Sequence, residues 1–288
     1  HMVTLARSRS VHGPWEDCPH NPIVRTRSAA EPWWSRGHAS VVEGPAGDWW
    51  MVYHGYENGF RTLGRQALLE PIEWTADGWF RAKGGTLAGD LPKPRGGKPS
   101  PAGAALSDDF ARSRLGTQWS FHAPGPDEAS RIRHENSSLL LRGKGKALAD
   151  CSPLCCTVGD RSYEVSVELE IAGEGHGGLA LFYDERGHAG LGFSRTQMLT
   201  YGYGQEQTWM RENLSFSRVH IRLRNRENVL TFWTSLDGKA WNQHPWQMEV
   251  SGLHHNVFGG FVSLRVALFC AGPGEIRARN FVYRGLVS

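Results

Sequence analysis

The chain has 288 residues, 40% of them apolar, with 12 Trp, 12 Phe and 7 Tyr, so it can bury large cores and is not a disordered protein. Its formal net charge of +3 is too small, at this length, to indicate a nucleic-acid-binding protein. No run approaches the roughly 18 apolar residues of a membrane span, and "HMVTLARSRS" lacks the apolar core of a secretion signal, so we expect a soluble protein and favour the cytoplasm over secretion.

The first part of the chain reads as short strands separated by turns. Its β-rich runs are "MVTLARS", "HASVVEG", "WWMVYHGYE", "GRQALLEPIEWT" and "GWFRA". Two of them flank "GPAGD" at 44–48, which predicts a hairpin with a four- or five-residue loop. With 35 Gly and 15 Pro and no long helix-period segment, the pattern indicates an all-β protein.

Two nitrogen side chains mark the ends of this hairpin. His38 follows a glycine at the mouth of the first strand, and Arg65 follows a glycine beyond the second. From spacing alone, the simpler interpretation is a core histidine with satisfied hydrogen bonds and a surface arginine paired with Glu70 or Glu73. A functional pair is the alternative.

A segment rich in proline and glycine, "LAGDLPKPRGGKPSPAGAAL", has no apolar periodicity. It predicts a linker or extended strap at 91–106 between a first domain at 1–90 and a second domain at 107–288. Beyond it, "SLLLRG", "SYEVSVELEI", "GGLALFYD", "AGLGFSR", "VHIRLRNRENVLTFWTSLDGKAW", "GGFVSLRVALFC" and "RARNFVYRG" have the spacing of a β-sandwich. Alternation in two of these runs predicts one buried and one wet face, the wet one being either plain scaffold or a sugar-binding surface.

The cysteines are Cys18, Cys151, Cys155, Cys156 and Cys270. An odd number with an adjacent pair fits a reduced interior better than a disulfide framework. A metal site at the three central cysteines is disfavoured, because strand neighbours point to opposite faces and no second Cys/His pair completes a tetrahedral set. We expect buried or edge thiols.

Several of these stretches together resemble one enzyme family. "VTLARSRSVHGPWEDCPHNPIV", "RGHASVVEGPAGDWWMVYHG" and "LGRQALLEPIEWTADGWF" are similar to the last part of the catalytic propeller of glycoside hydrolase family 43. "DDFARSRLGTQWSF", "WTSLDGKAW" and "GGFVSLRVALFC" are similar to the concanavalin-like β-sandwich of its β-xylosidase branch. The resemblance covers nearly the whole chain, in the family's order.

The resemblance implies about two blades of a five-bladed propeller followed by a concanavalin-like sandwich. The chain would be the C-terminal part of an inverting, exo-acting β-xylosidase or α-L-arabinofuranosidase acting on xylo-oligosaccharides or arabinoxylan, with an N-terminal propeller segment missing. The alternative is a catalytically silent carbohydrate-binding or structural fragment. The family's three catalytic acids have no matching position here, so no catalytic residue is expected in this chain. The acids Glu31, Asp48, Glu57 and Asp77 are not candidates, because turns and loops commonly hold solvated acids.

Three residues receive a role from the resemblance. His38 of "GHAS" would lie near the propeller axis, bearing on a catalytic carboxylate or on a central calcium ion. Arg65 of "LGRQ" would line the sugar subsite and lower the pKa of an adjacent carboxylate. Phe261 would help to close the active-site pocket, with Phe258 as its rival.

Overall fold

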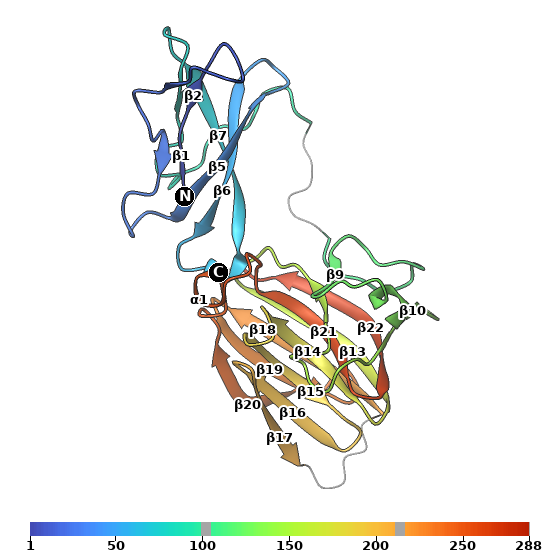
Figure 1. Cartoon of the computed structure of the whole chain (residues 1–288). Helices are drawn as coiled ribbons and strands as arrows, with labels where there is room; N and C mark the ends of the chain where they lie inside the picture. The colour runs from blue at the N-terminus through green and yellow to red at the C-terminus, as the bar shows by residue number, and fades with distance from the viewer. Residues whose placement is uncertain (99–104, 211–216, 288) are drawn as a thin grey trace. The chain divides into compact units, whose positions relative to one another are not determined.

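The computed structural model describes residues 1–98, 105–210 and 217–287. The chain divides into two compact units, residues 1–102 and 103–288, which we describe separately. The division falls inside the predicted linker 91–106, of which residues 99–104 lie outside the described residues. Nearly all regular structure is β-sheet (Figure 1). None of the helices in the described ranges has the length and hydrophobicity needed to cross a bilayer.

The first unit is built around one four-stranded antiparallel sheet, in the order β5-β6-β7-β8, which is the strand number of a propeller blade. Two-stranded sheets, β1-β4 and β2-β3, accompany it. Buried Met51, Tyr53, Leu68, Ile72 and Phe80 form its core with Val3 and Val24. The elements are β1 (Met2–Val3), β2 (Ala6–Arg7), β3 (Glu16–Asp17), β4 (Val24–Arg25), β5 (Trp33–Glu43), β6 (Trp49–Glu57), η1 (Arg61–Leu63), β7 (Arg65–Trp74) and β8 (Phe80–Ala82).

The predicted hairpin is confirmed, with β5 and β6 joined by a five-residue loop at 44–48. The Gly44 amide donates to the Asp48 carbonyl at 2.6 Å, and the Gly47 amide donates to the Gly44 carbonyl at 3.0 Å. The Asp48 carboxylate accepts from the Trp50 indole at 2.9 Å and from the Arg95 amide at 3.3 Å. Leu87, just before the predicted linker, also packs on the core of this unit, and Arg95 within the linker contacts the 44–48 loop through Asp48.

The second unit consists mainly of two seven-stranded antiparallel sheets, in the orders β10-β11-β22-β13-β18-β19-β20 and β17-β16-β15-β14-β21-β12-β9 (Figure 1). We call them the β13 sheet and the β14 sheet. Their elements are β9 (Trp119–Phe121), η2 (Glu128–Arg131), β10 (Ile132–His134), β11 (Leu139–Arg142), β12 (Leu154–Cys156), β13 (Tyr163–Gly173), β14 (His176–Phe182), β15 (His188–Phe193), β16 (Gln197–Gly202), β17 (Gln205–Met210), β18 (Arg218–Arg226), β19 (Val229–Ser235), β20 (Asn242–Glu249), α1 (His255–Phe258), β21 (Arg265–Ala271) and β22 (Gly274–Gly285).

The two sheets differ in how they are covered. Along β18, buried residues alternate with partly exposed ones, as the sequence pattern predicts for a sheet with one wet face. In contrast, every residue of β15 and β21 is buried. A cluster that includes Leu148, Cys151, Tyr201 and Phe269 covers one face of the β14 sheet. This sheet is therefore packed on both faces.

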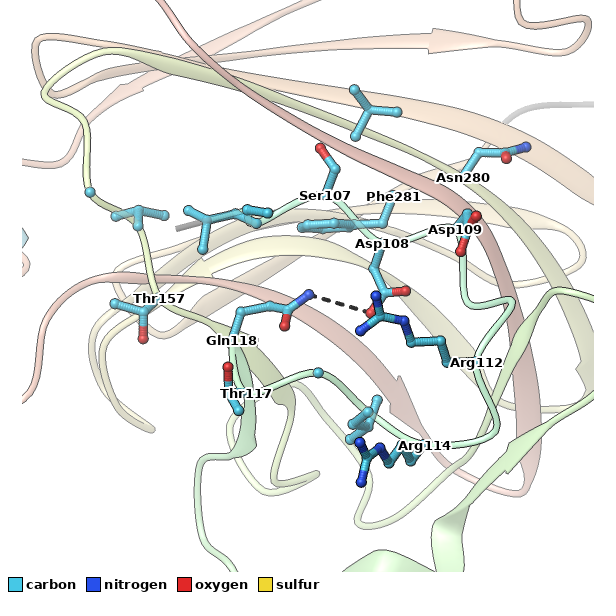
Figure 2. A pocket seen from close by; sticks show the side chains of 17 residues that line it. Ser107, Asp108, Asp109, Arg112, Arg114, Thr117, Gln118, Thr157, Asn280 and Phe281 are labelled. Carbon is cyan, nitrogen blue, oxygen red and sulfur yellow. Dashed lines mark hydrogen bonds between the residues drawn. The ribbon is translucent and has the colours of Figure 1, made fainter. Parts of the chain in front are cut away.

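The first acid of "DDF", Asp108, has a structural role in the second unit. Asp108 forms a backbone bridge with Phe281, and its carboxylate accepts from the Trp119 indole at 3.0 Å and the Gln118 amide at 3.4 Å. A groove of about 1090 Å³ lies beside this acid (Figure 2). The backbone bridge ties the segment before β9 onto β22, and the carboxylate ties the same segment to the start of β9.

All five cysteines are free and buried, as expected of reduced thiols. Cys155 and Cys156 are adjacent in β12, and Cys155 belongs to the cluster on the outer face of the β14 sheet. Burial raises the pKa of Cys151, Cys156 and Cys270 to about 12 and that of Cys155 to about 11. These thiols are protonated and unreactive in the folded chain.

Candidate functional site

His38, His54, Tyr56 and Arg65 gather at the end of the four-stranded sheet that lies away from the 44–48 loop. We call this group the histidine end. In β6, His54 lies opposite Gly37, and Tyr56 lies opposite Arg65 at the start of β7. Since side chains two residues apart in a strand share a face, His54, Tyr56 and Arg65 point to the same side of the sheet.

Backbone irregularity explains the two glycines that precede His38 and Arg65. The β5–β6 register shifts on both sides of Gly37, and His38 adopts a positive φ of 62°. A Cβ atom at residue 37 would lie 2.7 Å from the Met2 backbone nitrogen, so this close approach requires glycine. Gly64 has a φ of 72° where η1 ends. Each glycine therefore allows a local change of backbone direction. These changes place His38 and Arg65 at the histidine end.

The histidines of this end contact one another. The ring centroids of His38 and His54 are 5.9 Å apart, and those of His1 and His54 are 4.9 Å apart. The Arg65 guanidinium carbon lies 5.8 Å from the centroid of the Tyr56 ring. His38 is exposed, His54 and Arg65 are half-buried, and Tyr56 is buried.

This arrangement disfavours a positive charge on His54. Burial, followed by the positive charges of Arg65, His38 and the amino group of His1, lowers the pKa of His54 from its ordinary value of 6.5. Both of its ring nitrogens are buried and make no hydrogen bond within the described part of the chain. The neutral imidazole is therefore the stable form at the histidine end.

The two glutamates considered as partners for Arg65 are engaged elsewhere. Glu70 is fully buried and accepts hydrogen bonds from the Tyr53 hydroxyl at 2.7 Å and from the Gly84 amide. Glu73 pairs with Lys83 at 2.8 Å. The structure thus gives both carboxylates other partners.

One acid departs from its expected environment. Glu31 was expected to be a solvated loop residue, which is wrong, because it forms a nearly buried ion pair with Arg36 at 2.9 Å. Arg36 also donates to the carbonyls of Gly85 at 2.7 Å and Arg25 at 3.0 Å. This pair ties the loop before β5 to the segment after β8 and has a structural role.

The histidine end does not match a calcium site by itself. Calcium takes six to eight oxygen ligands, whereas the groups around His38 are imidazoles. Within residues 1–98, 105–210 and 217–287, no group of three or more His, Cys, Asp or Glu side chains could hold a metal ion. His38 alone supplies at most one ligand here.

Phe261 lies in a short loop of the second unit, after α1. The residue is 63% exposed, and its ring stacks on that of His255 with centroids 4.0 Å apart. The Phe261 amide also donates to His255 Nδ1 at 3.2 Å. Its φ of 57° lies in the left-handed region. The loop thus presents this ring outward.

The rival Phe258 is held in place by the turn after β14. Its ring lies 5.8 Å from that of Tyr183, and the Arg186 guanidinium donates to its carbonyl at 2.6 Å. The Tyr183 hydroxyl also donates to the Gly259 carbonyl. Phe258 is therefore an anchor of the loop, and Phe261 is the aromatic residue that it exposes.

The sequence interpretation singled out His38 and Arg65 but missed His54 and Tyr56. A signal for both was present, since they alternate in "VYHGYE" within the predicted second strand. Counting the hairpin register outward from the five-residue loop would pair His38 with His54, and the observed register shift moves that pairing by one residue to Gly37.

Family profiles match both units of the chain. One described as "Glycosyl hydrolases family 43" matches residues 1–80. Another, described as "Beta xylosidase C-terminal Concanavalin A-like domain", matches residues 107–282. Together they agree with the resemblance and the expected fold class.

Two of the curated relatives match over nearly the full chain and a third over part of it. A non-reducing end alpha-L-arabinofuranosidase of Bacteroides ovatus is 24% identical over 300 residues, which is 96% of this chain and 55% of that protein. A xylan 1,3-beta-xylosidase of a Vibrio species is 25% identical over 326 residues, covering 98% and 59% of the two chains. A beta-xylosidase of Bacillus subtilis is 30% identical over 108 residues, which is 32% of this chain and 20% of that protein.

Solved structures share the fold. A family 43 protein of Bacillus licheniformis superposes with a TM-score of 0.86 at 22% identity, over 99% of this chain and 60% of that one. A xylan beta-1,4-xylosidase of Bacillus halodurans gives a TM-score of 0.82 at 22% identity with the same coverage. The chain spans between 55% and 60% of the length of the relatives that match it throughout.

Proposed function

The chain belongs to glycosyl hydrolase family 43, and from this premise we propose that it is part of an inverting, exo-acting enzyme that releases pentose from xylo-oligosaccharides or arabinoxylan. The names of the relatives, an arabinofuranosidase and xylosidases, support a pentose-releasing activity. Because the chain spans little more than half of those relatives, the activity belongs to the whole protein of which these residues form a part.

The match of both units to family 43 profiles carries this proposal, and the charges at the histidine end support it. His54 lies near Arg65 and His38. Burial, and then the positive charges of these neighbours, lower the pKa of His54. A carboxylate brought to this end would find cationic and hydrogen-bond-donating groups already positioned. Such an environment suits the catalytic base, a carboxylate that must stay ionised.

In an inverting mechanism, one carboxylic acid protonates the leaving oxygen while a carboxylate activates water on the opposite face of the sugar. The two groups stand roughly 6.5–9.5 Å apart. We assign Arg65 the role of donating to substrate hydroxyls and keeping the neighbouring base ionised. His38 supports a carboxylate from the same end. The acids themselves come from the rest of the enzyme.

Two further assignments belong to this proposal. Phe261 contacts sugar from the sandwich unit, which its outward presentation supports. Calcium binding at His38 rests on the resemblance alone, and any ion there would take most of its oxygen shell from water. Calorimetry with calcium and this chain should then show weak binding, and tight binding of zinc instead would contradict the assignment.

The experiment is hydrolysis of aryl β-xyloside and aryl α-L-arabinofuranoside by the whole protein, with this chain alone assayed beside it. We expect pentose release by the whole protein and none above background by the chain. If the whole protein releases no pentose from either substrate, the enzyme proposal is wrong, and the carbohydrate-binding or structural alternative takes its place.

A further inference from the structure

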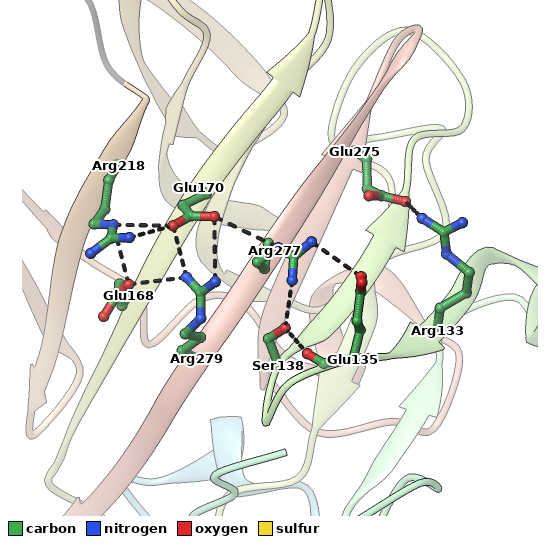
Figure 3. A network of polar contacts seen from close by, with 9 residues as sticks. All are labelled: Arg133, Glu135, Ser138, Glu168, Glu170, Arg218, Glu275, Arg277 and Arg279. Carbon is green, nitrogen blue, oxygen red and sulfur yellow. Dashed lines mark hydrogen bonds and ion pairs between the residues drawn. The ribbon is translucent and has the colours of Figure 1, made fainter. Parts of the chain in front are cut away.

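The outer face of the β13 sheet carries a lattice of arginines and glutamates. In one part of it, Glu168 and Glu170 lie between three arginines (Figure 3). Arg218 bonds Glu170 at 2.7 Å, and Arg279 bonds Glu170 at 2.8 Å and Glu168 at 3.2 Å. Arg277 joins this group to Glu135 at 3.2 Å. Here the opposite charges are nearly balanced.

A second part of the same face has an excess of positive charge. The carboxylate of Glu164, in β13, is the shared partner of three guanidiniums. Arg224 bonds it at 2.6 Å, Arg284 at 2.8 Å, and Arg222 lies 3.7 Å away. Three positive charges against one negative charge leave this group with a net charge of +2. We call it the Glu164 cluster.

The carboxylate lies beneath the arginines. The Glu164 side chain is 9% exposed, whereas that of Arg284 is 64% exposed. At this point the guanidinium groups are therefore exposed to solvent, and the nearly buried Glu164 carboxylate bonds them from the protein side. This differs from an ordinary surface ion pair, in which both partners are solvated.

Two tryptophan rings stack against two of the guanidiniums of the cluster. The Arg222 guanidinium carbon lies 3.9 Å from the centroid of the Trp241 ring, and that of Arg224 lies 4.7 Å from the Trp233 ring. Trp233 lies directly opposite Arg222 in the β18–β19 pair. Cation–π contact of this kind fixes a guanidinium and reduces the entropy lost when it binds a ligand.

Arg222 differs from its neighbours in one respect. Its buried Nε makes no hydrogen bond to any of the described residues, and its carboxylate partner is more distant than those of Arg224 and Arg284. A guanidinium has five N–H donors in a fixed fork that matches a carboxylate. Arg222 is therefore held in place by stacking on Trp241, with a longer link to Glu164 than Arg224 and Arg284 have.

We propose that the Glu164 cluster is a binding site for the uronate carboxylates of an acidic, xylan-type glycan. The proposal rests on the proposed function for the class of glycan, and on charge complementarity for the acidic substituent. The fork of Arg222, with Arg224 and Arg284 beside it, receives the carboxylate. The site lies on the sandwich unit and is separate from the histidine end of the first unit.

The test is calorimetric titration of this chain with a glucuronate-substituted xylo-oligosaccharide and with the neutral oligosaccharide of the same backbone length. We expect the acidic ligand to bind at least about tenfold more tightly, with an affinity that falls as salt is added. Arg222→Gln and Arg284→Gln should each reduce the affinity toward that of the neutral ligand. Arg284 is exposed, so its variant should keep the fold.

Two further variants separate a built site from general charge. Arg222→Lys keeps the charge but loses the fork, so it should weaken binding nearly as much as Arg222→Gln. Arg133→Gln removes an exposed arginine that is paired with Glu275 in another part of the unit, and it should leave the affinity unchanged. Thermal unfolding of each variant checks that the sandwich is intact.

The proposal is overturned if the acidic and neutral ligands bind equally or if neither binds. It is also overturned if Arg133→Gln is as damaging as Arg222→Gln, or if a DNA oligonucleotide of similar charge binds as tightly as the glycan. Because titration needs no turnover, its outcome is independent of the aryl pentoside assay. Binding by this chain together with no pentose release by the whole protein would contradict the proposed enzyme and leave this site standing.

Discussion

The histidine end of the first unit and the arginine face of the second gather nitrogen side chains in opposite ways. On the face, guanidiniums alternate with carboxylates along a ladder of regular register. At the histidine end, the register is broken and imidazoles lie against one another. Around Glu168 and Glu170 the charges of the face nearly balance, whereas the end places positive groups together that oppose the protonation of His54.

The two regions differ in how they contribute to the stability of the fold. Cross-strand ion pairs each contribute little and tolerate substitution. A group of positive side chains that opposes the protonation of His54 persists only because the surrounding backbone holds it. Positive φ at His38 and the glycine beside the Met2 backbone are the devices that do so. The comparison therefore predicts large functional effects at the end and small structural ones on the face.

The largest effect is expected at Arg65. In the whole enzyme, Arg65→Ala should lower kcat/KM by about 10²- to 10⁴-fold, because losing a charged partner in a dry site costs about 2–5 kcal/mol. Stability should barely change. Arg65→Lys should keep most of the defect, since a point charge cannot replace two parallel hydrogen bonds. Steady-state kinetics of both variants decide the matter, and near-normal values would remove Arg65 from the active site.

The buried ion pair of the first unit should give the next largest effect, this time on stability. Arg36→Ala leaves the Glu31 carboxylate nearly buried without its charge partner, which costs about 3–5 kcal/mol. Lys83→Ala is the matched control, because its exposed pair with Glu73 contributes at most about 1 kcal/mol. Denaturant unfolding measures both. Equal small losses would show that the Glu31–Arg36 pair behaves as a solvated one.

A smaller effect should appear with pH. The folded-state pKa of His54 lies below its ordinary value of 6.5, so the unfolded chain binds the proton more readily. Stability is then lost as the pH falls below about 6.5, at up to about 1.4 kcal/mol per pH unit for one histidine. His188, whose pKa burial lowers, adds the same trend in the sandwich.

Free energies of unfolding at about pH 7.5 and about pH 5.5 test this for the chain and for His54→Gln. The variant should lose less stability on acidification than the parent chain. A parent and a variant with identical pH dependence would show that the histidine end exerts no opposition to protonation, which would weaken its contrast with the arginine face.

The smallest effect is expected on the face itself. Arg218 is 53% exposed and shares Glu168 and Glu170 with Arg279. Arg218→Gln should therefore change the free energy of unfolding by at most about 1 kcal/mol, and added salt should reduce the difference. A loss of several kcal/mol would mean that the lattice acts as a cooperative unit, and the proposed contrast would then fail.

Alternation and turn residues were sufficient to predict much of the fold. The hairpin around 44–48 and the wet face of β18 appear where the pattern indicated. The β14 sheet also shows why such reasoning has limits. Its strands are buried on both faces, so runs such as "GGLALF" and "AGLGF" do not alternate between apolar and polar residues. The sequence therefore does not indicate which side chains face which side of the sheet.

The candidate site was only partly predictable. His38 and Arg65 were found through family motifs, whereas spacing alone favoured a structural role for both. The proximity of His54 depends on hairpin register, and the bulges beside Gly37 cannot be read from composition. The Glu31–Arg36 pair joins a loop to the segment after β8, a tertiary contact that no local pattern encodes.

The distribution of cysteines makes opening of the two units separately observable. Cys18 is the one cysteine of the first unit, and the other four are buried in the sandwich. A thiol-alkylating reagent reaches a buried cysteine only when the surrounding structure opens. One added label therefore reports opening of the first unit, and four further labels report the second. The number of labels, measured by mass spectrometry, thus reports how often each unit opens, and no mutation is needed.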